Sequence, residues 1–164
     1  MSELLPSEGA VQAVDITAMR RAAAGTLRGQ LPLGIESPAE LILQLRTYME
    51  VLAPEVERAA AGLPRDDVPR YCALACVGEA RGKLRAQPGT GPGRDAAHAR
   101  RLARSLIALC DHYAALTGQA MCLACDREIH TTDGAVSYDQ VSNSGGGLTG
   151  RVHSDCVNAP RPRR

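Results

Sequence analysis

Two pairs of metal-binding residue types lie near the C-terminal end of the sequence. Cys122 and Cys125 are separated by two residues, and the same spacing separates His153 from Cys156. Two intervening residues allow a tight turn to present both side chains to one ion from the same side. Three thiolates and one imidazole form a closed tetrahedral set, which is typical of structural zinc sites. The sequence therefore predicts a structural zinc ion bound by these four residues, with no open position for a reactive water.

Three other interpretations of these residues are possible. His130 follows Cys125 by five residues and could replace His153 as a ligand, although only His153 shares the two-residue spacing with Cys156. The cysteines could also be ordinary thiols, with His153 a surface histidine. A thioredoxin-like redox pair at Cys122 and Cys125 would require a strand–helix–strand context, which the surrounding sequence does not show. We favour the zinc site that contains His153.

The segment that carries these residues must bring two distant pairs together. Helical periodicity stops after Gly118, and the stretch GAVSYDQVSNSGGGLTGRVHSDC predicts two short strands around a Ser/Asn/Gly loop. A region this small and this poor in large apolar residues needs metal binding to supply its folding free energy. We expect a zinc-binding module over residues 119–158. The arrangement resembles zinc-ribbon and treble-clef modules, with the second pair near a helix start.

The sequence before this module carries strong helix start signals. Asp15 is expected to cap a first helix with the sequence ITAMRRAAAGTLRG. The run Ser37-Pro38-Ala39-Glu40 combines a capping box with proline at the first helical position, which predicts a second helix. The apolar stripe of that helix continues to Val56. Pro54 lies inside the stripe and removes a backbone donor, so a kink or break is expected there.

Two further helices are expected over residues 68–85 and 94–118, where apolar residues recur at spacings of three and four. Small residues dominate the apolar face of the third helix, which allows a neighbouring helix to approach closely. Gly118 stands where a C-terminal cap belongs. The expected fold is mainly α: an antiparallel four-helix bundle over residues 15–118, followed by a small β-hairpin module stapled by zinc. Residues 1–14 are expected to be a flexible N-terminus.

Composition and charge narrow the possible environments of the chain. Its 164 residues include no Trp and no Phe, which favours an aliphatic core of packed helices. The formal net charge of +1 gives no global field that would attract nucleic acid or an anionic membrane. The N-terminal sequence MSELLPSEGA does not read as a signal peptide, and no apolar run approaches the ~20 residues that cross a bilayer. We therefore expect a cytoplasmic protein with reduced cysteines and no membrane partner.

The remaining cysteines are interpreted as packing residues. Cys72, Cys76 and Cys110 lie on predicted helices among Ala, Leu and Val, where a buried cysteine acts as a small hydrophobe. Cys72 and Cys76 are one helical turn apart, so a second metal site is the alternative. Asp111 and His112 beside Cys110 do not suggest a catalytic pair, because adjacent helix positions point in different directions. A surface pair at a helix end is the expected arrangement.

Three stretches carry a resemblance to a known family. The segments LILQLRTYMEVLAPEVE, VPRYCALACVGEARGKLR and ARRLARSLIALCDHYAAL resemble small helical proteins of actinobacteria that are labelled natural-product biosynthesis proteins of undefined activity. The resemblance covers about residues 15–116. It implies a helical architecture and a biosynthetic setting, and it carries over neither an activity nor any site residue.

Arginines near the C-terminal end are candidates for contact with a partner. The stretch RPRR and one upstream arginine give the module a small positive end, formed by Arg151, Arg161, Arg163 and Arg164. Arginines beside a zinc module can bind phosphates or an acidic protein surface. The alternative is that residues 159–164 are only a flexible, solubilising Arg/Pro-rich tail.

Three functional hypotheses follow, in decreasing order of preference. The first is a non-catalytic interaction or regulatory protein that binds a protein partner through the bundle and the zinc module, since the closed metal site accompanies no acid–base constellation. The second is a nucleic-acid-binding regulator that uses the zinc module and the arginine tail, although most such domains are distinctly basic. The third, suggested by the resemblance alone, is a small-molecule carrier or enzyme in natural-product biosynthesis.

Overall fold

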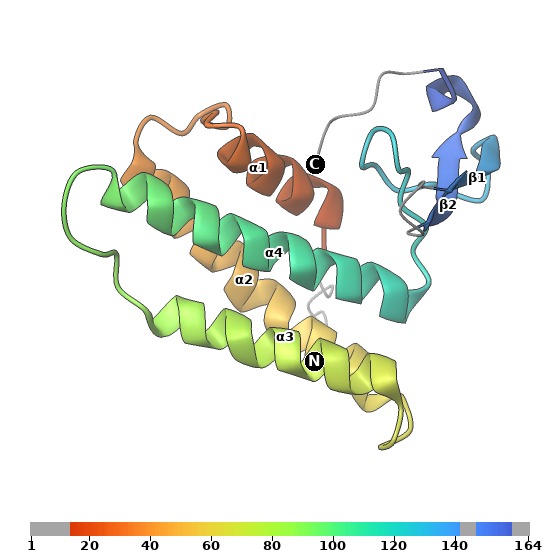
Figure 1. Cartoon of the computed structure of the whole chain (residues 1–164), viewed down its shortest axis with the longest axis horizontal. Helices are drawn as coiled ribbons and strands as arrows, with labels where there is room; N and C mark the ends of the chain where they lie inside the picture. Colours follow the sequence, from red (N-terminus) through yellow and green to blue (C-terminus); the bar gives the residue numbers. More distant parts are fainter. Residues whose placement is uncertain (1–13, 142–146, 159–164) are drawn as a thin grey trace, which may run out of the picture.

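The computed structural model describes residues 14–141 and 147–158, and these form four helices followed by a β-hairpin (Figure 1). The expected N-terminal segment, apart from residue 14, and the whole Arg/Pro-rich tail lie outside the described residues. The elements are, in chain order, α1 (Ile16–Leu27), α2 (Pro38–Ala61), α3 (Val68–Arg85), α4 (Arg94–Thr117), β1 (Ala135–Val141), β2 (Gly147–His153) and the short 3-10 helix η1 (Ser154–Cys156). The predicted fold class is confirmed.

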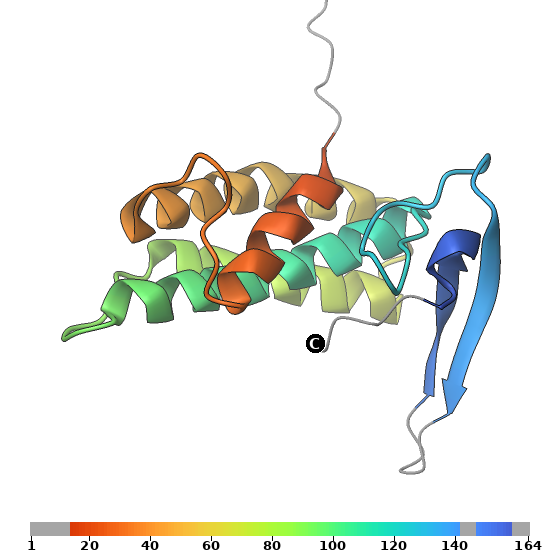
Figure 2. The ribbon, with the colours of Figure 1, turned by 90° about the horizontal axis from the view of Figure 1, so that it is seen from above.

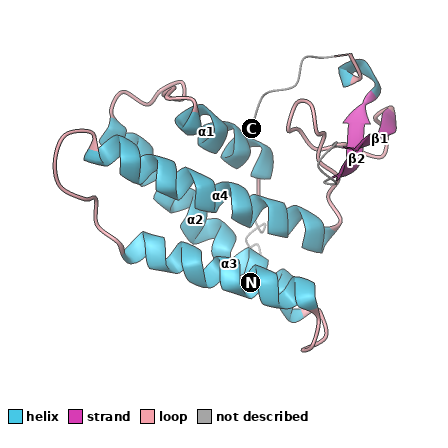
Figure 3. Ribbon diagram, viewed as in Figure 1, coloured by secondary structure: helices cyan, strands magenta, loops and turns pink. Residues whose placement is uncertain are grey.

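The four helices form an antiparallel bundle with α4 at its centre. Successive helices reverse direction, and α4 packs against α1, α2 and α3 (Figures 1 and 2). The hairpin lies beyond the end of the bundle where α4 finishes and α1 begins (Figure 3). None of the described helices combines the length and apolar character needed to cross a bilayer.

The helix ends follow the capping signals of the sequence. The Asp15 carboxylate accepts a hydrogen bond from the Ala18 N–H at 2.9 Å, and the Ser37 hydroxyl accepts one from the Glu40 N–H at 3.2 Å. These contacts satisfy backbone donors that lack a partner in the first helical turn. At the C-terminal end of α4, Gly118 caps the helix with a φ of 73°, a left-handed conformation that glycine adopts without strain. All three caps are as the sequence predicts.

Mutation of Ser37 directly tests whether its hydroxyl stabilises the start of α2. Replacing Ser37 with alanine should lower the free energy of unfolding by about 1 kcal/mol, because the Glu40 N–H loses its acceptor at the start of α2. Urea denaturation followed by far-UV circular dichroism measures the change. Threonine at the same position keeps the hydroxyl and should preserve most of the stability, whereas equal losses in both variants would contradict the capping role.

Helix α2 continues through Pro54 without a break, so the break expected as one possibility at this position is absent. Pro54 is exposed, whereas Leu52, Ala53 and Val56 around it are buried. Burial of these neighbours against α3 and α4 stabilises the helical path, and tertiary packing of this kind commonly outweighs one missing backbone hydrogen bond.

The core of the bundle is aliphatic. Its largest fully buried side chains on α2 and α4 are Leu45, Met49, Leu52, Leu102, Leu106 and Leu109. Helix α3 contributes the small residues Ala73, Val77 and Ala80, which lets it pack closely on α2 and α4. With no Phe or Trp in the chain, interdigitated Leu, Val and Ala fill the interior, as the composition predicts.

The C-terminal module is built on an antiparallel hairpin. Strands β1 and β2 pair from Ala135 with His153 to Val141 with Gly147, across the loop that the sequence predicts. The buried apolar residues described in this module are Cys122, Ala124, Ile129 and Val152. So small a cluster provides little hydrophobic stabilisation for a separate folding unit.

Candidate metal centre

The first two candidate ligands lie on a tight turn, residues 121–128, that we call the knuckle. The Cys122 N–H donates to the Arg127 carbonyl at 2.8 Å, and the Asp126 N–H donates to the Cys122 carbonyl at 2.9 Å. Asp126 adopts a φ of 58°, in the left-handed region that Asp and Asn tolerate better than most residues. This geometry folds the chain back sharply, so Cys122 and Cys125 face the same point.

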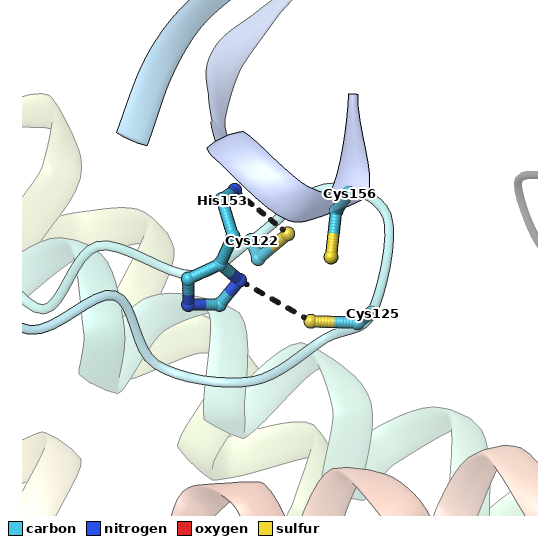
Figure 4. A group of neighbouring side chains, drawn as sticks. All are labelled: Cys122, Cys125, His153 and Cys156. Atoms are coloured by element: carbon cyan, nitrogen blue, oxygen red, sulfur yellow. Dashed lines mark hydrogen bonds between the residues drawn. The ribbon is translucent and has the colours of Figure 1, made fainter. Parts of the chain in front are cut away.

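Strand β2 carries the other two candidate ligands back to the knuckle. The Leu123 N–H donates to the Arg151 carbonyl at 3.0 Å, which attaches the knuckle to β2. Gly150 lies where a Cβ atom would stand 2.8 Å from Leu123 Cδ1, so a larger residue there would require the Leu123 side chain to move. His153 then ends the strand, and η1 turns the chain so that Cys156 points toward the same centre (Figure 4).

The four predicted ligands come together as one group. Their ligand atoms lie within 4.8 Å of one another at Cys122, Cys125, His153 and Cys156, and Cys122 is fully buried (Figure 4). Ideal Zn–S bonds of about 2.3 Å in a tetrahedron place sulfurs about 3.8 Å apart, so a small contraction around an ion would complete the geometry. Three sulfurs and one imidazole nitrogen are suitable donors for a metal ion of this kind.

The orientation of His153 indicates which ring nitrogen could bind a metal. Its Nδ1 lies 3.4 Å from Cys125 Sγ, inside the group, while its Nε2 lies 3.3 Å from the Glu128 carbonyl and 3.5 Å from Asp133 Oδ2. A carbonyl accepts only, so Nε2 carries the proton and Nδ1 presents its lone pair to the centre. Histidines that bind metals commonly donate their other N–H to a carbonyl or carboxylate in this way.

The electrostatics of the thiols also suit a cation. Burial raises the pKa of Cys122, but the N–H groups of His153, Cys125 and Ala124 outweigh this effect and lower it to about 6. Burial likewise opposes ionisation of Cys125, yet hydrogen bonds from Arg127 lower its pKa. The pKa of Cys156 is raised to about 11, first by burial and then by the neighbouring thiolates. Ionisation of one thiol therefore opposes ionisation of its neighbours, and a bound cation would remove the repulsion between the thiolates.

The structure separates His153 from its competitor. His130 is exposed and does not join the group; its backbone N–H donates to Asp133 Oδ2 at 2.9 Å. Arg151 lies exposed on β2. The other predicted partner contacts, Arg161, Arg163 and Arg164, lie outside the described residues.

The other cysteines differ in their surroundings. Cys110 is buried, as expected, and burial raises the pKa of its thiol to about 12. Cys76 is half-buried and Cys72 is exposed, so the interpretation of Cys72 as a buried hydrophobe is wrong. Cys72 falls on the outer side of α3 because the inward stripe of that helix runs through Ala73, Val77 and Ala80. The metal-binding group found among the described residues includes neither Cys72 nor Cys76.

Sequence reasoning missed a buried arginine that joins the bundle to the module. Arg20 on α1 is only 4% exposed, and its guanidinium lies 2.5 Å from Asp111 on α4 and 3.6 Å from Asp126 in the knuckle. Asp111 is therefore more than a surface residue at a helix end. One signal was available: Arg20 follows the core residue Ile16 by four positions, which places it on the flank of the same helix face.

Comparison with known proteins connects the bundle to a family. Residues 17–118, more than half of the chain, match a family of unknown function (DUF6415). The match covers the four helices and ends at the cap of α4, before the candidate metal ligands. No curated protein and no solved structure matches the chain. By its helical bundle, the chain belongs to this family of unknown function.

Proposed function

We propose that the chain is a non-catalytic zinc protein that binds a protein partner through its bundle and its C-terminal module. The observation that carries this proposal is the convergence of three cysteines and one histidine within 4.8 Å. Four protein ligands fill a tetrahedral zinc shell, which leaves no position for a substrate or a reactive water. Such an ion serves the fold, and its role here is to hold a binding surface beside the bundle.

The choice of zinc rests on donor chemistry. Thiolate-rich tetrahedral sites favour zinc, whereas magnesium and calcium prefer oxygen ligands. The six described cysteines are all free, as in proteins of reducing compartments, and we propose a cytoplasmic location on this ground. Elemental analysis of the purified chain tests the metal: one equivalent of zinc is expected, and a different metal or none would contradict the assignment.

Several apolar side chains on the bundle are free for a protein partner. The α1–α2 connection exposes Leu31 and Leu33, and α3 exposes Val68 and Tyr71. The two groups lie at opposite ends of the bundle (Figure 1), so each offers a partner a separate, small apolar contact rather than one continuous patch. From the resemblance of residues 15–116, we also propose that this partner belongs to a natural-product biosynthetic system.

A pulldown tests the partner. The immobilised zinc-loaded chain should retain a protein from lysate of its source cells, and mass spectrometry identifies what is retained. The purified candidate should then bind directly, and more weakly to Cys122→Ser, which disrupts the module. Failure to recover any direct binder, or a binder indifferent to the module, would contradict this function.

A nucleic-acid-binding regulator is the second candidate. It is supported by the exposed arginines Arg127 and Arg151 on the module. Binding of duplex DNA should weaken as salt rises, because phosphate contacts release counterions. Measurement of DNA affinity at two salt concentrations decides this candidate, and the absence of salt-dependent binding would remove it.

The carboxylate beside His153 should tune zinc affinity. Replacing Asp133 with asparagine removes the negative charge 3.5 Å from Nε2 and should weaken zinc binding about tenfold, as changes next to metal-bound histidines commonly do. Competition with a chromogenic chelator measures the affinity. Asp155→Asn is the matched control, because Asp155 is exposed beside Cys156 and forms no ion pair with a described residue. Equal effects in both variants would show that only general charge matters.

A further inference from the structure

A small cleft lies between α1 and the knuckle. Its volume is about 170 Å³, below the range of about 300–1,000 Å³ typical of sites for drug-sized ligands. Four arginines line it, together with two groups that can carry negative charge, Asp126 and the candidate metal ligand Cys125. A cleft of this size and composition suits one anionic group rather than a whole cofactor.

The α1 wall of the cleft is a single helix face. Its residues follow one another at spacings of four, three and four: Thr17, Arg21, Ala24 and Arg28. Positions at these spacings lie above one another on a helix surface. Arg21 and Arg28 are exposed, and the short side chain of Ala24 between them leaves room for the cleft. Two guanidinium groups can therefore reach the same space, with Arg127 on the opposite wall.

The ion pairs and hydrogen bonds of the four arginines show which of them remain available to bind an anion. Arg20 is bound to Asp111 and Asp126. Arg127 donates to the Cys125 thiolate, and it offsets the net charge of −1 that three thiolates and one zinc ion carry. Arg21 and Arg28 form no ion pair with any carboxylate in the described parts of the chain. Arg28 uses only its Nε–H, which donates to Gln30 Oε1 at 3.2 Å.

We propose that this cleft binds the phosphate group of a phosphate monoester. Two unpaired guanidinium groups match the charge of about −1.5 to −2 that such a group carries at neutral pH. Guanidinium forks donate paired hydrogen bonds to phosphate oxygens, and a tetrahedral group accepts them from several directions at once. The Thr17 hydroxyl adds a further donor. The proposed function includes no phosphate site, so this proposal goes beyond it.

The same phosphate chemistry has two sources, a free phosphate ester and a phosphorylated side chain of another protein. The full zinc-loaded chain is titrated with inorganic phosphate, then with phosphoserine, and then with a phosphoserine peptide and its unphosphorylated counterpart. Ionic strength is held constant with sodium chloride, because screening alone changes weak contacts of this kind. Arginine Nε–Hε resonances report binding directly.

Saturable shifts of the Arg21 and Arg28 resonances are expected with each phosphate compound. Arg21→Gln and Arg28→Gln should each weaken binding about tenfold, the loss of one charge-assisted contact. Arg85→Gln is the matched control, since Arg85 is exposed at the end of α3. A peptide that binds more tightly than phosphoserine assigns the site to a phosphorylated protein; equal affinities assign it to a small ester.

Three outcomes would overturn the proposal. The first is the absence of saturable shifts in wild-type protein whose zinc content and helicity are normal. The second is an equal loss of phosphate binding in Arg85→Gln, which would show diffuse attraction to the whole surface. The third is binding of a single-stranded DNA oligonucleotide through Arg21 and Arg28 without any response to phosphate monoesters. That result would indicate a surface that binds the nucleic-acid backbone instead.

Discussion

Replacing Cys122 with serine should unfold the C-terminal module while the four helices remain intact. Cys122 is the fully buried member of the candidate metal group, and its thiolate accepts the His153 N–H at 3.4 Å. Structural zinc sites contribute on the order of 10 kcal/mol or more to the folding of small domains. The described apolar cluster of the module is too small to replace that contribution, whereas the bundle has an extensive aliphatic core of its own.

Three measurements distinguish the module from the bundle. Elemental analysis should show loss of the one equivalent of zinc, and far-UV circular dichroism should show that helicity is retained. In the amide NMR spectrum, resonances of residues 119–158 should collapse toward random-coil positions, while those of α2 and α3 keep their dispersion. Removal of zinc from the wild-type chain with a chelator should give the same spectrum.

Cys72→Ser is the control for this experiment. Cys72 is exposed on α3 and lies outside the metal group, so its replacement should change neither zinc content nor the module spectrum. A module that keeps its dispersed resonances without metal would refute the structural role of zinc. Loss of the helices together with the module would instead show that the two parts fold as one unit.

Replacing Asp111 with alanine should destabilise the bundle more than removal of any single exposed ion pair. Arg20 is 4% exposed, and among the described carboxylates Asp126, at 3.6 Å, remains near it when Asp111 is absent. The Asp111 side chain is 49% exposed, so water reaches part of the Arg20 guanidinium when that carboxylate is removed. We expect a loss of about 2 kcal/mol, smaller than the roughly 3–5 kcal/mol for breaking a fully buried pair. The Nε atom of Arg20 already lacks a hydrogen-bond partner among the described residues.

Urea denaturation with excess zinc measures this loss of unfolding free energy. Glu57→Ala is the matched control, because it removes the exposed pair with Arg81 and should change stability by less than about 1 kcal/mol. Adding Arg20→Met to Asp111→Ala should recover part of the loss, since an apolar side chain of similar length needs no partner. A loss for Asp111→Ala no larger than that for Glu57→Ala would refute the stabilising role of the Arg20–Asp111 ion pair.

The local features of the fold were predictable from the sequence. Helix starts at Asp15 and Ser37 and the end at Gly118 depend on hydrogen bonds within a few residues, so neighbouring residues specify them. The apolar face of each helix follows from its periodicity in the same way. The candidate ligands were predictable because each pair lies on one turn, and the matching spacing connects Cys122 and Cys125 with His153 and Cys156.

Contacts between distant segments were not predictable from these patterns. Arg20, Asp111 and Asp126 lie on α1, α4 and the knuckle, and no spacing in the sequence relates them. The same holds for the cleft that Arg21 and Arg28 share with Arg127, and for the contacts that leave Nδ1 of His153 facing the thiols. The sequence by itself determined the helices, their apolar faces and the ligand types. Only the tertiary structure decided which charges meet, because packing of α1 on α4 and docking of the module on the bundle set their distances and their burial.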